Sequence, residues 1–192
     1  MSTLYKPKII FVFGGPGSGK GLQCEKMAES YGLLPLSPGE LLRTEFHTDT
    51  ERSRLVRDIL ERGEQLPVGA LLELLREAMG TAPDHVKGFL LDGFPRNIQQ
   101  TVEFEAKIGE PSLVLLLECS PDTMCRRLQQ RPQSGFQSED SRDAVRKRVQ
   151  SFFRECEPIA AHYERKRLLY KIDAEGPPDE VFQQACQLLD SC

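Results

Sequence analysis

KIIFVFGGPGSGK, residues 8–20, is the stretch of sequence that decides the fold. Its first half, residues 8–13, is rich in β-branched and aromatic residues, which is typical of a buried strand in a parallel sheet. Its second half is a cluster of glycines closed by Lys20, and the pattern of residues 19–31 predicts a helix directly after it. This succession of buried strand, glycine-rich turn and helix predicts an α/β fold.

The glycine-rich turn fits the pattern G-x-x-x-x-G-K from Gly14 to Lys20. Glycines let several backbone N–H groups converge on phosphate oxygens, and the start of a helix adds a favourable dipole. Lys20 is placed to neutralise the β- and γ-phosphates of a nucleotide. The alternative, a flexible turn with a solvated lysine, is disfavoured because pattern and context agree. We therefore predict that ATP binds at Gly15, Pro16, Gly17, Ser18, Gly19, Lys20, Gly21 and Leu22.

Magnesium is expected at Asp92 rather than at the residue after Lys20. The general pattern places Ser or Thr there, with its hydroxyl on Mg²⁺, but this chain has Gly21. Asp92 ends the apolar run at residues 88–92, and the carboxyl ends of parallel strands line the ligand crevice. We predict that Asp92 holds Mg²⁺ directly or through water, although an Asp-Gly pair is also common in ordinary turns.

Strand and helix patterns alternate along the whole chain. Further strands are predicted at residues 33–36, 88–92, 112–118 and 168–172, with helices at 38–47, 51–62, 68–79, 97–107, 121–130, 142–167 and 179–189. This alternation predicts a parallel five-stranded sheet with helices on both faces. Ser37 and Glu40 have the spacing of a capping box. Because no repeat or linker divides the chain, we predict a single domain over residues 1–192.

Composition excludes several classes of protein. The chain has 192 residues, of which 39% are hydrophobic and 28% charged, as in globular domains. Its net charge of −4 disfavours nucleic acid as a partner, and no apolar run is long enough to span a membrane. The six cysteines include no C-x-x-C pair, so we expect reduced thiols, although the even count also allows three disulfides. With no secretion signal recognised, we predict a cytoplasmic protein.

Four segments resemble the sequential signatures of adenylate kinases and their UMP/CMP kinase relatives. They are GPGSGKG at residues 15–21, LSPGELLR at 36–43, DGFPR at 92–96 and DAEG at 173–176. The resemblance runs from about residue 8 to residue 186 with the motifs in matching order. Residues 131–141 resemble the lid of the short-lid, cytosolic isoenzyme 1 type.

The resemblance implies a P-loop NTPase fold with two mobile parts. These are a helical monophosphate-binding insertion at about residues 37–66 and a short lid at about residues 131–141. It also implies a monomer that transfers a phosphoryl group reversibly from ATP-Mg²⁺ to a nucleoside monophosphate, most simply ATP and AMP to two ADP. Since the acceptor phosphate itself attacks, catalysis rests on alignment and on neutralisation of charge.

The site residues follow from the resemblance position by position. The charged groups expected to act in catalysis are Lys20, Arg96, Arg127, Arg131 and Arg148. Arg127 and Gly176 join the loop in binding ATP, and Gly176 is expected near the adenine. The acceptor site is expected to comprise Pro38, Arg43, Glu64, Gln65, Leu66, Gly93, Phe94, Pro95, Arg96, Gln100, Gln137 and Arg148.

Three positions depart from the family pattern. Leu22 and Pro38 stand where adenylate kinases have threonine, and Gln137 stands near a lid position that carries arginine. Each change removes a polar contact to a substrate, and one hydrogen bond to a charged group is worth about 1.5–3 kcal/mol. Two alternatives to an AMP kinase stay open: a catalytically weak nucleotide-binding protein that acts through a partner, and a kinase that prefers UMP, CMP or dAMP. Gln100 favours AMP, because its amide can pair with an adenine edge.

Overall fold

The computed structural model describes residues 8–64, 66–130 and 139–191. Its centre is a five-stranded parallel sheet in the order β2-β3-β1-β4-β5. The strands are β1 (Lys8–Gly14), β2 (Leu33–Leu36), β3 (Gly88–Asp92), β4 (Leu113–Glu118) and β5 (Leu169–Asp173). The predicted α/β sheet is therefore confirmed.

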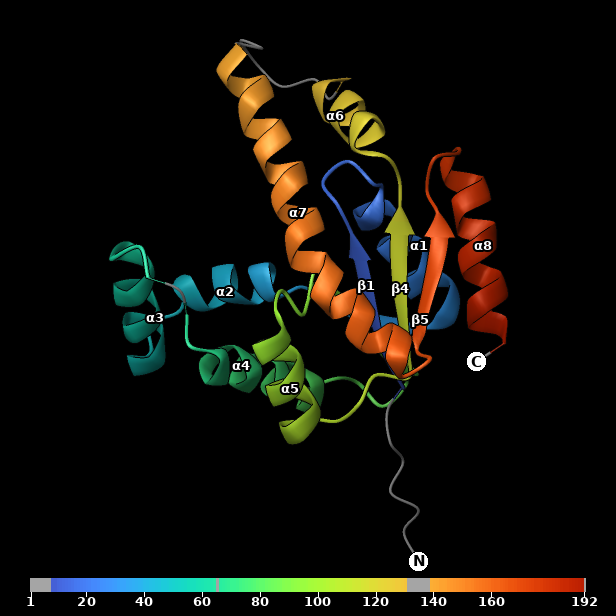
Figure 1. Ribbon diagram of the computed structural model, residues 1–192. Coiled ribbons are helices and arrows are strands. Elements are labelled where there is room, and N and C mark those ends of the chain that lie inside the picture. The colour runs from blue at the N-terminus through green and yellow to red at the C-terminus, as the bar shows by residue number, and fades with distance from the viewer. Residues whose placement is uncertain (1–7, 65, 131–138, 192) are drawn as a thin grey trace, which may run out of the picture.

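Helices cover both faces of this sheet (Figure 1). They are α1 (Lys20–Tyr31), α2 (Pro38–Phe46), α3 (Glu51–Glu61), α4 (Val68–Gly80), α5 (Ile98–Lys107), α6 (Pro121–Gln130), α7 (Glu139–Arg165) and α8 (Pro178–Asp190). Because successive side chains of a strand point to opposite faces, β1 supplies two separate cores. Ile10 and Val12 pack with α1 and α8, whereas Phe11 packs with α4, α5 and α7.

The strand order places a crevice at the carboxyl ends of the central strands. β1 lies between β3 and β4, so the connections that leave β1 and β3 run to opposite sides of the sheet. Ligands of open α/β sheets bind at such switch points. In Figure 1 the strands point toward the loop before α1 and toward α6, while α2 and α3 project to one side.

The structure corrects two local predictions. Helix α7 begins at Glu139 rather than at residue 142, so residues 139–141 of the predicted lid are helical, in keeping with the preference for acidic residues in a first helical turn. Residues 131–138 lie outside the described part. Ser37 stands at the N-cap of α2, but its side chain makes no capping hydrogen bond, and the reciprocal capping box lies instead between Thr50 and Ser53 of α3. Pro38 at the first position lacks an N–H, which leaves α2 with less need for a cap.

Two further features concern membrane-spanning helices and disulfides. Within the described ranges, no helix is long and apolar enough to cross a membrane. The five cysteines of that same part form no disulfide.

A buried carboxylate ties together α2, α3 and α4. Glu45 of α2 is only 7% exposed and accepts hydrogen bonds from Arg52 of α3, at 2.9 Å from Nε and 3.0 Å from Nη2. Arg52 also pairs with Glu77 of α4. Hydrogen bonding to Arg52 holds the pKa of Glu45 below its ordinary value. The position of α2, which carries Arg43, therefore depends on Arg52.

We expect Arg52→Ala to lower the free energy of unfolding by about 1–3 kcal/mol, because the Glu45 carboxylate then stays buried without its cation. Urea titration measures this loss. The control is Arg54→Ala, whose pair with Asp49 is exposed and should contribute almost nothing. Because the folded pKa of Glu45 is depressed, the stability from this pair is present above the ordinary pKa of 4.5 and is lost as pH falls through the lower folded value. Equal losses in the two variants would contradict the assignment.

Candidate functional site

The loop between β1 and α1 has the backbone of an anion site. Gly17 and Gly19 have φ values of 79° and 86°, in the left-handed region that favours glycine. The Ser18 N–H donates to the Gly15 carbonyl at 3.0 Å, which closes the turn. No side chain caps α1, so its first N–H groups point outward from the loop, where an anion is favoured.

Lys20 and Asp92 form an ion pair at the floor of the crevice. Lys20 begins α1, and Asp92 ends the neighbouring strand β3. Both side chains are about three-quarters buried, with exposed fractions of 25% and 23%. The structure thus brings together the lysine and the acid that were predicted to bind phosphate and Mg²⁺.

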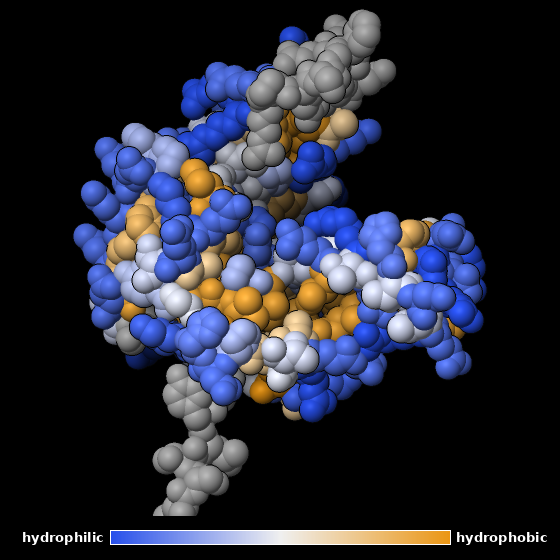
Figure 2. Space-filling model, turned by 180° about the vertical axis from the view of Figure 1, so that it is seen from behind, coloured by the Kyte–Doolittle hydropathy of each residue, from blue (hydrophilic) through white to orange (hydrophobic). Residues whose placement is uncertain are grey.

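A central cleft of about 660 Å³ lies between the sheet and the α2–α3 projection. In Figure 2, hydrophobic atoms gather in a hollow between the body of the molecule and this projection, with hydrophilic side chains around it. Of the residues predicted for the acceptor site, the cleft is lined by Pro38, Arg43, Glu64, Leu66, Gly93, Phe94, Arg96 and Gln100. The ring of Phe94 itself is buried and packs on Phe11 and Phe104.

A second hollow of about 350 Å³, the loop cleft, adjoins the central cleft. It is lined by Gly15 and Pro16 of the loop and also by Pro95 and Arg148. The residues common to both clefts are Lys20, Gly93, Arg96 and Glu155. The two hollows therefore meet at two cations and one acid.

A third hollow, the α1–α8 pocket, opens on the other side of the loop with a volume of about 200 Å³. It contains residues predicted for ATP, namely Gly17, Ser18, Gly19, Leu22, Arg127 and Gly176. Arg127 donates to the carbonyls of Gly17, Ala174 and Glu175, and so joins the loop to the segment after β5. Gly21 lines none of these hollows, and a Cβ there would meet no atom within 4 Å.

Gln100 is engaged within the protein. Its Oε1 accepts from the Arg96 backbone N–H at 2.7 Å. The backbone N–H of Gln100 donates to Oδ1 of Asn97, the N-cap of α5, at 2.9 Å. Pairing of both amide atoms with an adenine edge would therefore require the bond to Arg96 to open. Three predicted site residues, Gln65, Arg131 and Gln137, lie outside the described residues.

Sequence patterns missed two residues of the crevice. Glu155 of α7 lines both clefts, and Gln23 of α1 lines the α1–α8 pocket. Neither belongs to a phosphate-binding pattern, and only the packing of α7 and α8 places them here. No local sequence signal marks either residue as part of the site.

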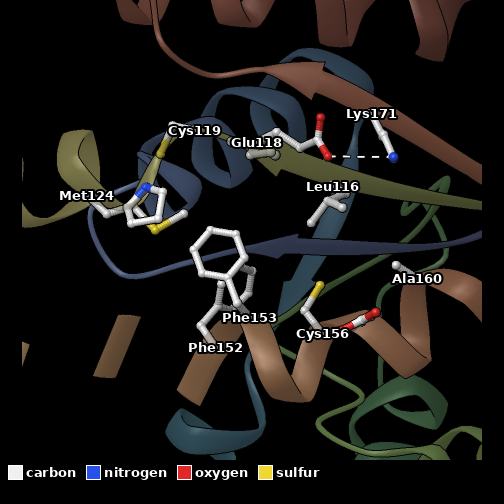
Figure 3. A pocket seen from close by; sticks show the side chains of 12 residues that line it. Leu116, Glu118, Cys119, Met124, Phe152, Phe153, Cys156, Ala160 and Lys171 are labelled. Carbon is white, nitrogen blue, oxygen red and sulfur yellow. Dashed lines mark ion pairs between the residues drawn. The ribbon is translucent and has the colours of Figure 1, made fainter. Parts of the chain in front are cut away.

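An apolar cavity of about 410 Å³ lies behind the loop cleft, between α7 and β4 (Figure 3). Phe152 and Cys156 line both hollows and form the wall between them. Burial raises the pKa of Cys156 to about 11, so this thiol is protonated near neutral pH. At the rim, Lys171 pairs with Glu118 at 3.7 Å. A Cβ at Gly15 would come within 2.6 Å of Met124 Sδ and 2.9 Å of Phe152 Cδ1, so the cavity wall supports the loop directly.

Comparisons with known proteins agree on one family. The family model described as adenylate kinase matches residues 12–168. The chain is 52% identical, over its full length, to adenylate kinase isoenzyme 5 of Mus musculus and covers 34% of that protein. It is 44% identical to adenylate kinase isoenzyme 1 of Sus scrofa, over 98% of this chain and 97% of that one. The chain therefore spans about a third of its isoenzyme 5 relatives and nearly all of its isoenzyme 1 relatives.

Proposed function

Since this chain belongs to the adenylate kinase family, we propose that it transfers a phosphoryl group reversibly from ATP-Mg²⁺ to a nucleoside monophosphate, and that AMP is the preferred acceptor. The observation that carries this proposal is the junction of the two clefts. Lys20 and Arg96 face both the phosphate-binding loop and the cleft that holds Arg43 and Gln100. Two phosphates bound on either side of this junction would meet between the same cations.

The proposed roles follow from this placement. Lys20 holds the phosphates of ATP on the loop, while Arg43 and Arg96 clamp the phosphate of the acceptor. Arg148 borders the loop cleft and stabilises the charge on the transferring group. Arg127 and Gly176 border the α1–α8 pocket, on the side of the ATP base. Arg131 and Gln137 are proposed for the same chemistry from the lid, on the resemblance alone.

Magnesium is proposed to arrive with ATP and to be held by Asp92. Mg²⁺ keeps several waters and is usually bound through one or two carboxylates together with substrate phosphates. A single carboxylate beside the phosphate-binding loop fits that donor set. The described residues hold no cluster of three or more His, Cys, Asp or Glu that would bind a metal without the nucleotide. The ion supplies charge neutralisation between the phosphates.

The test is the formation of ADP from ATP-Mg²⁺ with AMP, dAMP, CMP and UMP as acceptors. We expect the highest kcat/KM with AMP, because Gln100 carries the amide suited to adenine. A higher value with CMP or UMP would move the preference to pyrimidines. Nucleotide binding without turnover on any acceptor would favour the weak nucleotide-binding alternative, which rests on Leu22, Pro38 and Gln137.

Three further expectations, on domain organisation, oligomeric state and location, belong to the same proposal. We infer a single domain over residues 1–192, a monomer and a cytoplasmic location, supported by the similarity to isoenzyme 1 over nearly its full length. Sedimentation of the purified chain tests the monomer, and a tagged chain imaged in cells tests the location.

Glu155 offers a direct test of the electrostatics of the junction. Its carboxylate shares both clefts with Lys20 and Arg96, where it opposes the charge of incoming phosphates. We expect Glu155→Gln to lower the KM for the monophosphate roughly two- to fivefold, the size typical of an exposed charge. The matched control is Glu157→Gln on the same helix, which lines the apolar cavity instead. An unchanged or higher KM in Glu155→Gln would contradict this role.

A further inference from the structure

Gln23 of α1 is a buried polar side chain that satisfies only half of its amide. It is 2% exposed, and its Nε2 donates to the Pro178 carbonyl at 2.9 Å. Its Oε1 is buried and has no hydrogen-bond partner among the described residues. A buried acceptor without a partner is rare in folded proteins and calls for an explanation at each site where it occurs.

The orientation of this amide is fixed by chemistry. A carbonyl oxygen only accepts hydrogen bonds, so the Pro178 carbonyl must face the nitrogen of Gln23 and not its oxygen. Turning the amide over would place two acceptors against each other. The unpartnered atom is therefore an oxygen, and its complement is a hydrogen-bond donor.

The position of Gln23 specifies which donor this is. Gln23 and Pro178 both line the α1–α8 pocket, which is also lined by Gly17, Ser18 and Gly19 of the phosphate-binding loop. The rest of the lining includes the apolar side chains of Leu22 and Val181, which suit the faces of an aromatic base. A nucleotide whose phosphates bind the loop can place its base in this pocket.

We propose that Gln23 selects the base of the phosphate donor, with Oε1 accepting a hydrogen bond from the exocyclic amino group of a 6-aminopurine. This inference rests on the proposed function, because it assumes that the loop holds the phosphates of the donor nucleotide. Adenine carries an amino donor at position 6. A 6-oxopurine presents an acceptor at the same position, so its oxygen would oppose Oε1 and leave both groups unpaired. A site whose buried polar group is left unpaired rejects such an analogue more strongly than one that merely loses a contact.

The experiment is a calorimetric comparison of three Mg²⁺-triphosphates with different groups at position 6 of the purine, the 6-oxo compound also carrying a proton on N1. These are ATP, purine riboside triphosphate, which has hydrogen there, and ITP, which has oxygen. We expect wild type to bind ATP about 3- to 10-fold more tightly than purine riboside triphosphate, the value of one hydrogen bond. ITP should bind more weakly still, on the order of 10- to 100-fold below ATP.

The decisive variant is Gln23→Met, which keeps the length of the side chain and removes the acceptor. We expect this variant to bind ATP and purine riboside triphosphate about equally. Its affinity for purine riboside triphosphate should be that of wild type. Circular dichroism checks the fold. Should Gln23→Met not fold, Gln23→Asn replaces it with the same expectation, because it draws the amide back by one methylene. Leu22→Ala is the matched control: it alters the same pocket without a polar group, so the ratio should be retained.

The outcomes separate this inference from the proposed function. Equal binding of the three triphosphates by wild type, or an unchanged ratio in Gln23→Met, overturns the role of Gln23 whether or not the chain transfers phosphate. Binding is measured without an acceptor, so a chain that discriminates the bases but forms no ADP refutes the transfer reaction and supports base selection by Gln23.

Discussion

Lys20→Met is expected to lower kcat/KM for ADP formation by about 10²–10³-fold, the usual cost of removing one preorganised charge from a transition state. Lys20 is the cation common to the loop cleft and the central cleft, so its loss affects the phosphates on both sides of the junction. A coupled assay of ADP formation at saturating AMP measures the loss, and calorimetry with ATP-Mg²⁺ shows how much of it lies in binding.

The control for this variant is Lys26→Met. Lys26 lies on the same helix and pairs at 3.1 Å with Asp179, whose side chain is 94% exposed. It faces no phosphate site, so its removal should leave activity unchanged and lower stability by about 1 kcal/mol at most, since its ammonium also lies 5.7 Å from the centroid of the Phe182 ring. Residual activity in Lys20→Met within threefold of Lys26→Met would show that Lys20 is not part of the reaction.

Gly17→Ala should have the second largest effect, because two constraints coincide at this residue. Its φ of 79° is strained for any side chain, and a Cβ would lie 2.7 Å from the Met124 carbonyl oxygen, which is backbone and cannot turn aside. We expect the loop to shift, with a loss of about 1–3 kcal/mol in stability and on the order of 10²-fold in kcat/KM. Urea titration and the ADP assay measure the two losses.

Alanine variants of two neighbouring glycines distinguish the effect of backbone strain from that of the steric clash with Met124. Gly19 has a similar φ of 86°, but a Cβ there meets nothing within 4 Å, so Gly19→Ala should show the backbone strain alone, about 1–2 kcal/mol. Gly21 lies within α1 in open space, and Gly21→Ala should raise stability by about 0.5–1 kcal/mol, as expected for a helical glycine. If Gly17→Ala behaved like Gly19→Ala, contact with Met124 would be irrelevant.

The fold could be predicted because its signals are local. Each strand is a short apolar run, and parallel strands bring their carboxyl ends to one edge, so the phosphate-binding loop and Asp92 had to lie together. The alternation of residues along β1, which supplies two cores, follows from the same periodicity. Ser37 shows the limit of this reasoning. Its capping pattern indicates only that a capping hydrogen bond is possible, and in the structure its side chain makes none.

The rest of the crevice depends on packing between distant segments. Gln23 becomes significant only because α8 brings the Pro178 carbonyl against it, 155 positions further along the chain. Glu155 faces the phosphate clefts because of the angle at which α7 crosses the sheet, and no local pattern contains that angle. Arg127 was predicted from the resemblance, but its bonds to three backbone carbonyls were not, since irregular loops supply the acceptors.

Lys20 and Asp92 form an ion pair, so each of them must exchange its partner for a ligand ion of the same charge before it can bind that ligand. In this pair each charged group serves as the counterion of the other. In the proposed reaction, a triphosphate alone would take the lysine and leave a bare carboxylate beside its own negative charge. A divalent cation alone would take the carboxylate and leave the ammonium group facing it. Only the two together would replace one ion pair with two, so the affinity for each would be thermodynamically coupled to the presence of the other.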